Sequence, residues 1–136
     1  MRLQICLLIL LCIGCQPNVE ELPILSYKIN TKSEKEFYRV SYSGFTNQEG
    51  KQMTSQTIQN KIVVANFFFT RCPSICPPMR TVLIDISKTF INDDAVILIS
   101  HSIDPKNDTI EVLKQYSEAT EIPSSKWLFL RSNEEN

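Results

Sequence analysis

The sequence lacks the features that mark several broad classes of protein. Lys and Arg number 14 against 15 Asp and Glu, and no basic run stands out that would neutralise a phosphate backbone. We therefore expect no nucleic-acid partner. The chain also has no internal repeat and no low-complexity tract. Its 136 residues, 43% hydrophobic and 21% charged, predict one globular domain of ordinary composition.

The chain has no apolar run long enough to span a membrane as a helix. The longest run, residues 5–13, follows one positive charge at Arg2 and falls well short of the roughly 20 residues that a spanning helix needs. We interpret residues 1–14 as a signal peptide. The run ends in "CIGC", which resembles a bacterial lipobox with Cys15 as the lipidated residue, and cleavage without lipid is the alternative. Both predict an exported chain, and the lipobox predicts one anchored to a bacterial membrane, facing the periplasm or the cell exterior.

Few cysteines remain for the folded part of the chain. Because Cys6 and Cys12 belong to the signal peptide and Cys15 to the lipid anchor, only Cys72 and Cys76 are left. In a helical or tightly turned segment, residues four apart lie on one face, so two sulfurs can converge on one ion, and a thiolate pair suits Cu(I). Structural zinc wants four ligands, and two cysteines with a single histidine fit it poorly. A disulfide that only staples the loop is the alternative.

The segments around the cysteines predict an α/β fold. Residues 61–70 form an apolar, β-branched run that predicts a strand covered on both faces, and residues 77–90 carry the apolar stripe of a helix. If Cys76 enters that helix, the positive end of the helix dipole favours its thiolate. The other predicted elements are a tether over 16–36, strands over 37–45, 95–100 and 126–130, and a helix over about 109–119 capped by Asp108. This order implies a parallel sheet with right-handed crossovers, and such sheets place their chemistry at the carboxyl ends of the strands.

Four segments resemble one known family. The run "FFFTRCPSICPPM" is similar to the copper-site motif of the SCO/SenC family, which comprises copper-handling proteins of cytochrome c oxidase assembly with a thioredoxin-like fold. Three more segments match in order: "GFTNQEGKQMT", "SHSIDPKNDT" and "KWLFL". The resemblance covers about residues 22–136. It implies a partial thioredoxin-like domain over 37–136, preceded by a lipid-anchored tether over 15–36.

The resemblance implies a membrane-tethered metallochaperone. Such a protein binds copper through Cys72, Cys76 and a distant histidine, and prepares the copper centre of cytochrome c oxidase subunit II together with other copper-delivery proteins. The family's histidine lies beyond "RSNEEN", so the chain resembles a C-terminally truncated member without the last strands and helix. We therefore expect the strand over 126–130 to be an open edge.

His101 is the only histidine, and it follows the predicted strand over 95–100. It is a candidate substitute third ligand, and the alternative is a strand-end residue hydrogen-bonded to the neighbouring loop. Asp104 and Asp108 are interpreted as turn and cap residues, respectively, and a functional role for them is the less favoured alternative.

Two alternatives to the copper function stay open. One is a thiol-disulfide oxidoreductase acting on exported cysteines, although C-x-x-x-C differs from the C-x-x-C of thioredoxin-like redox motifs. The other is a fragment that has no function without the distal histidine.

Overall fold

The computed structural model describes residues 23–38 and 40–133. It divides into two compact units, Met1–Arg39 and Val40–Asn136. The predicted signal peptide and Cys15 lie outside the described residues. Within the described ranges, no helix has the length and apolar character needed to cross a membrane.

The first unit contains a small antiparallel hairpin. Strand β1 (Tyr27–Ile29) pairs with β2 (Lys35–Phe37), with Tyr27 opposite Phe37. The Asn30 side-chain oxygen closes the turn, because it accepts hydrogen bonds from the backbone N–H groups of Lys32 and Glu34. The part predicted to be an irregular tether therefore contains regular structure.

The predicted strand over 37–45 is wrong. Among its described residues, only the two at the ends belong to strands, Phe37 to β2 and Phe45 to β3 (Phe45–Asn47). The alternation of aromatic and polar residues misled the prediction, since Gly44 takes a positive φ of 86° that an extended strand does not contain.

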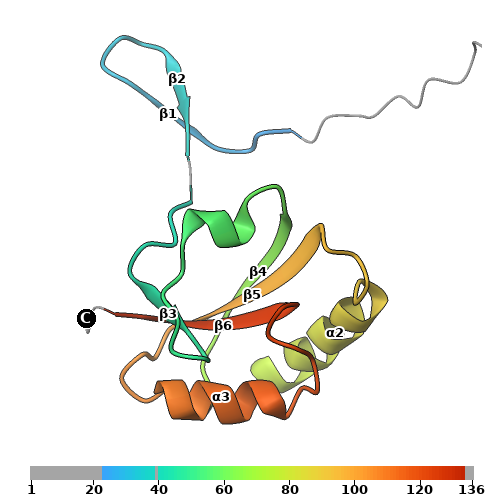
Figure 1. Cartoon of the computed structure of the whole chain (residues 1–136). Helices are drawn as coiled ribbons and strands as arrows, with labels where there is room; N and C mark the ends of the chain where they lie inside the picture. The colour runs from blue at the N-terminus through green and yellow to red at the C-terminus, as the bar shows by residue number, and fades with distance from the viewer. Residues whose placement is uncertain (1–22, 39, 134–136) are drawn as a thin grey trace, which may run out of the picture. The chain divides into compact units, whose positions relative to one another are not determined.

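The second unit is a four-stranded sheet in the order β3-β6-β5-β4. Strands β4 (Ile62–Phe68), β5 (Val96–Ser102) and β6 (Trp127–Ser132) run parallel, and β3 is antiparallel to β6. Helix α2 (Cys76–Thr89) connects β4 to β5, helix α3 (Ile110–Glu118) connects β5 to β6, and a short 3-10 helix, η1 (Ser55–Ile58), precedes β4. Figure 1 shows this succession of strand, helix, strand, helix and strand, which the sequence predicted.

The open edge of the sheet is not where the sequence placed it. Strand β6 lies between β5 and β3, and Phe45 pairs with Ser132. Among the described residues, β3 and β4 are the two edge strands, and an isolated bridge between Thr46 and Gln52 covers part of the outer side of β3. Consequently β4 is half exposed instead of buried on both faces, and Phe67 is 69% exposed.

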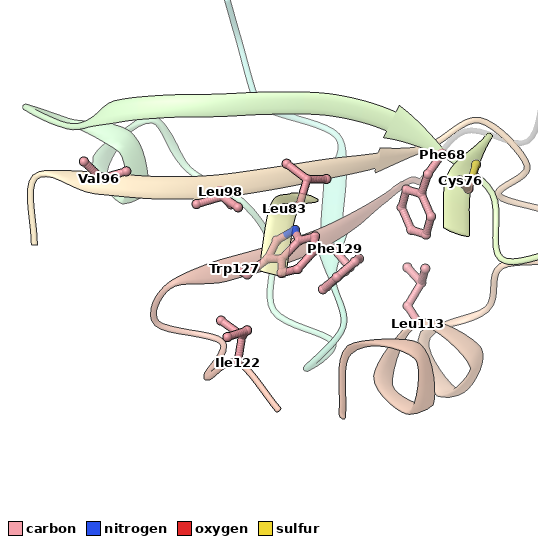
Figure 2. Close-up of a cluster of buried hydrophobic side chains, with 9 residues drawn as sticks. All are labelled: Phe68, Cys76, Leu83, Val96, Leu98, Leu113, Ile122, Trp127 and Phe129. Carbon is pink, nitrogen blue, oxygen red and sulfur yellow. The ribbon is translucent and has the colours of Figure 1, made fainter. Parts of the chain in front are cut away.

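Two apolar clusters cover the two faces of the sheet. The first contains Phe68, Leu98, Trp127 and Phe129 from the strands together with residues of α2 and α3, as Figure 2 shows. The second lies on the other face and contains Tyr42, Met53, Ile97, Ile99, Leu128 and Leu130. Adjacent residues of a strand therefore belong to opposite clusters, as alternation requires. The indole N–H of Trp127 donates to Ser100 Oγ at 2.8 Å, so its polar group is satisfied in the core.

Candidate metal centre

The two cysteines lie where β4 leads into α2. The strand ends at Phe68, and a turn follows in which the N–H of Cys72 donates to the carbonyl of Phe69 at 3.2 Å. Helix α2 begins at Cys76, with both Pro77 and Pro78 in its first turn. Prolines are tolerated there because the first N–H groups of a helix have no intrahelical acceptor. The chain thus places both sulfurs at the carboxyl edge of the parallel strands, as predicted.

The sulfurs of Cys72 and Cys76 are brought together without a disulfide. Both residues are free thiols, and the backbone N–H of Cys76 donates to Cys72 Sγ at 3.4 Å. Cys76 is only 4% exposed and packs beside Phe68 in the first cluster (Figure 2), whereas Cys72 is partly exposed at the edge of that cluster. The site therefore has one buried sulfur and one that solvent reaches.

The two thiols have opposite pKa shifts. The pKa of Cys72 falls from 9.0 to about 7, first because the Cys76 thiol hydrogen-bonds to its sulfur and then because backbone N–H groups, that of Ser74 foremost, do the same. The pKa of Cys76 is raised, chiefly by burial, and the Cys72 sulfur and the Asp108 charge add to the increase. The prediction that Cys76 is the activated cysteine is wrong. The N–H groups at the start of α2 stabilise the thiolate of Cys72 instead.

His101 lies on the other face of the sheet from the cysteines. It pairs with Phe67 across β4 and β5, and its ring is 5.4 Å from the Phe67 ring, while Phe68 faces Cys76. Its other neighbours are the rings of Tyr42 and Phe45, at 5.5 and 5.3 Å, and burial lowers its pKa. Within residues 23–38 and 40–133, no group of three His, Cys, Asp or Glu side chains could hold a metal ion. The structure therefore does not bring His101 to the cysteine pair, and aromatic packing replaces the hydrogen bond to a loop that the sequence suggested.

Asp108 has a role that the sequence did not predict. The cap of α3 is Thr109, whose side chain accepts from the N–H of Val112, so the assignment of Asp108 as the cap is wrong. Asp108 is instead fully buried, and its carboxylate accepts hydrogen bonds from Thr70 and Ser102. The signal that could have revealed this is Thr109 itself, which is also a good cap and leaves the preceding aspartate free.

Asp104 shapes the turn before α3, as expected. Its carboxylate accepts from the side-chain amide of Asn107 at 2.9 and 3.0 Å, and its carbonyl accepts from the N–H of Asp108 at 2.9 Å. These contacts use the carboxylate within its own loop. We therefore assign Asp104 no part in the metal centre.

The donor set of the site fits a soft monovalent ion. Two adjacent sulfurs, one of them about half ionised at neutral pH, match the preference of Cu(I) for thiolates in low coordination numbers. A hard ion such as Mg²⁺ or Ca²⁺ finds no set of oxygen ligands around these sulfurs among the described side chains.

Comparison with solved structures finds known proteins with a similar fold. A structure of BsSco, a member of the Sco family of cytochrome c oxidase assembly proteins in which a disulfide switch was identified, is 32% identical with a TM-score of 0.57 over 68% of this chain and 57% of that one. A SCO1/SenC family lipoprotein from Bacillus anthracis is 34% identical with a TM-score of 0.60, over 65% of this chain and 53% of its own. ScoI from Bradyrhizobium japonicum, solved with copper bound, is 27% identical with a TM-score of 0.57, over 65% and 55% of the two chains.

These matches cover only part of the length of the other proteins. The chain spans about half the length of the curated relatives it matches, for example 49% and 42% of two of them. The SCO1/SenC family model, however, matches residues 30–125, which include both cysteines and strands β3, β4 and β5. With the thioredoxin-like fold of its structural neighbours and the paired sulfurs at the strand edge, the chain belongs to the SCO1/SenC family.

Proposed function

We propose that this chain binds Cu(I) through Cys72 and Cys76 and acts as an assembly factor for the copper centre of cytochrome c oxidase subunit II. Family membership supports this proposal, and so do the copper in the ScoI structure and the assembly role ascribed to the Sco family. The observation that carries it is the contact between the two sulfurs, of which Cys72 is both accessible and readily ionised.

The asymmetry of the pair suggests an order of events for the copper cargo. The Cys72 thiolate meets the incoming ion first, because it is partly exposed and its pKa of about 7 leaves it half ionised at neutral pH. Cys76 then binds as it loses its proton, so loading releases protons to solvent. A partner with a better ligand set can remove the ion through the same exposed side, at Cys72.

The test is Cu(I) binding in competition with a chelator of known affinity. The protein is the full-length chain with Cys6, Cys12 and Cys15 each replaced by Ser, hereafter the Ser-background chain, held reduced in mild detergent. We expect one tightly bound Cu(I) per chain, which is lost in both Cys72→Ser and Cys76→Ser. Unsaturable binding, or binding that survives either replacement, would refute the proposal. If the Ser-background chain shows no cooperative unfolding, the result would favour the alternative that the chain is a fragment without function.

Thiol-disulfide exchange is the second candidate, because an exposed, acidic thiol beside a buried one is suited to it. The Cys72 thiolate would attack a target disulfide and release one target thiolate, and the Cys76 thiolate would then attack the mixed disulfide. The target gains two electrons and becomes a dithiol, while Cys72 and Cys76 form a disulfide. Reduction of a model disulfide that fails in Cys72→Ser supports this activity, whereas no reduction by the reduced chain rules it out.

We also propose that Cys15 carries a lipid and anchors the exported chain to the membrane. Support comes from the lipobox-like "CIGC" and from the Bacillus anthracis lipoprotein of the same family. Expression in a bacterium followed by detergent phase partition tests this. The wild-type chain should enter the detergent phase with an acylated N-terminus, and Cys15→Ser should not be acylated.

A further inference from the structure

One buried charge next to the cysteine site has no part in the chemistry above. Asp108 is 0% exposed and lies in the loop between β5 and α3. Burial of a carboxylate is costly unless hydrogen bonds replace its hydration, so its partners identify what it holds. Those partners are Thr70, in the turn that leads to Cys72, and Ser102, at the end of β5.

The contacts of Asp108 join two loops beyond the end of the strand pair. The backbone ladder between β4 and β5 ends with Phe68 opposite Ser102 and with the N–H of Ile103 donating to the Phe68 carbonyl at 2.9 Å. Past that point the Asp108 carboxylate accepts from the Thr70 N–H at 3.2 and 3.3 Å and from Thr70 Oγ1 at 2.5 Å. Its second oxygen accepts from Ser102 Oγ at 2.5 Å. The turn is thus held by a side chain where the sheet no longer holds it.

A short chain of contacts leads from this carboxylate to the sulfur pair. Thr70 lies two residues before Cys72, and the N–H of Cys72 donates to Phe69 within the same turn. Cys72 Sγ in turn accepts from the N–H of Cys76, at the start of α2. Displacement of the turn therefore separates Cys72 from the helix that orients it.

We propose that Asp108 is a positioning residue for the cysteine site, which fixes the turn at Thr70 and so keeps Cys72 against the start of α2. This role rests on the proposed copper function only for its effect on affinity, since the hydrogen bonds themselves can be measured without copper. Groups that orient metal ligands from outside typically change metal affinity by about 10–100-fold when they are replaced.

Replacements at both ends of the contact separate positioning from general stability. Asp108→Asn keeps the size of the side chain but turns one acceptor oxygen into a donor, which leaves a hydroxyl or an N–H without a partner. Thr70→Val removes the hydroxyl at nearly constant volume, and Thr70→Ser restores it. Asp104→Asn is the matched control, because that carboxylate is in the same loop but bonds only to Asn107 among the described side chains.

The experiment measures Cu(I) affinity, the unfolding midpoint and amide hydrogen exchange in the Ser-background chain. We expect Asp108→Asn to weaken Cu(I) binding by at least about tenfold while unfolding stays cooperative. Thr70→Val should weaken binding in the same direction, whereas Thr70→Ser and Asp104→Asn should bind as the parent does. Equal affinity in the parent and in folded Asp108→Asn overturns the proposal. If Asp108→Asn does not fold, equal affinity of Thr70→Val and Thr70→Ser overturns it.

Amide exchange makes the result independent of the copper function. In the copper-free, reduced chain, the N–H groups of Thr70 and Cys76 should exchange faster in Asp108→Asn than in the parent, and Asp104→Asn should leave both unchanged. If the parent fails to bind Cu(I) but shows this pattern, the proposed function fails and the positioning role stands. If exchange at Cys76 is the same in all variants, the positioning role is wrong whatever the copper result.

Discussion

The difference in pKa between the thiols of Cys72 and Cys76 can be tested by removing one of them. Cys76→Ala deletes the thiol whose hydrogen bond is the largest cause of the low pKa of Cys72. The backbone N–H groups near Ser74 remain, so we expect the pKa of Cys72 to rise from about 7 part of the way toward 9.0. In the complementary variant, Cys72→Ala, the remaining Cys76 thiol should still titrate above its ordinary value, because burial is the main reason for its raised pKa.

The magnitude follows from the ionised fraction and the nucleophilicity of Cys72. At pH 7 a thiol with a pKa of about 7 is half ionised and one with a pKa of 9.0 is about 1% ionised, a difference of about fiftyfold in thiolate. A more acidic thiol gives a weaker nucleophile, and a Brønsted slope of about 0.4–0.5 reduces intrinsic reactivity by about eightfold. Cys72 should therefore react at pH 7 about sixfold faster than an ordinary cysteine.

The assay follows the thiolate absorbance and the alkylation rate of the Ser-background chain from pH 5 to pH 10, with mass spectrometry to assign the modified residue. The parent should show a first midpoint at about 7, assigned to Cys72, and a separate, later one for Cys76. Because the folded-state pKa of Cys72 is depressed, its thiolate stabilises the native state above the pKa of the unfolded chain. That contribution is lost as the pH falls through about 7. A first midpoint at Cys76, or an unchanged Cys72 midpoint in Cys76→Ala, would refute the reasoning.

Three further predictions concern the sheet. Leu98→Ala should lower the free energy of unfolding by about 2–5 kcal/mol in a urea titration, because Leu98 is fully buried in the first cluster, and a loss below 1 kcal/mol would contradict that packing. The N–H of Ile62 donates to Ala95 beside β5, so by strand alternation the N–H of Val64 also faces β5 and that of Ala65 faces the free edge. Ala65→Pro should therefore be tolerated, whereas Val64→Pro should lower the free energy of unfolding by about 1–3 kcal/mol because it breaks a hydrogen bond to β5. Equal unfolding midpoints of the two variants would contradict this register. His101→Ala should leave Cu(I) affinity within about twofold of the parent, since the ring packs on the other face, and a tenfold loss in the chelator competition would restore it as a ligand.

The local pattern of the sequence was enough to predict the elements that carry the site. The β-branched run before Cys72, the apolar stripe that follows Pro78 and the buried strand over 95–100 correspond to β4, α2 and β5. These patterns depend on spacings of two to four residues, which one segment contains by itself. The placement of both cysteines at the carboxyl edge of the sheet follows from the same order of elements.

Tertiary structure decided which group does what at that edge. The sequence could not show that β3 pairs with β6, that His101 faces away from the sulfurs, or that Asp108 bonds to Thr70 instead of capping α3. Each depends on residues far apart in the chain that meet only after folding. The same holds for the thiols: the sequence alone determined that two cysteines stand at the start of a helix, but burial of Cys76 and the N–H groups around Cys72 decided which one ionises, because a pKa depends on surroundings that the spacing does not specify.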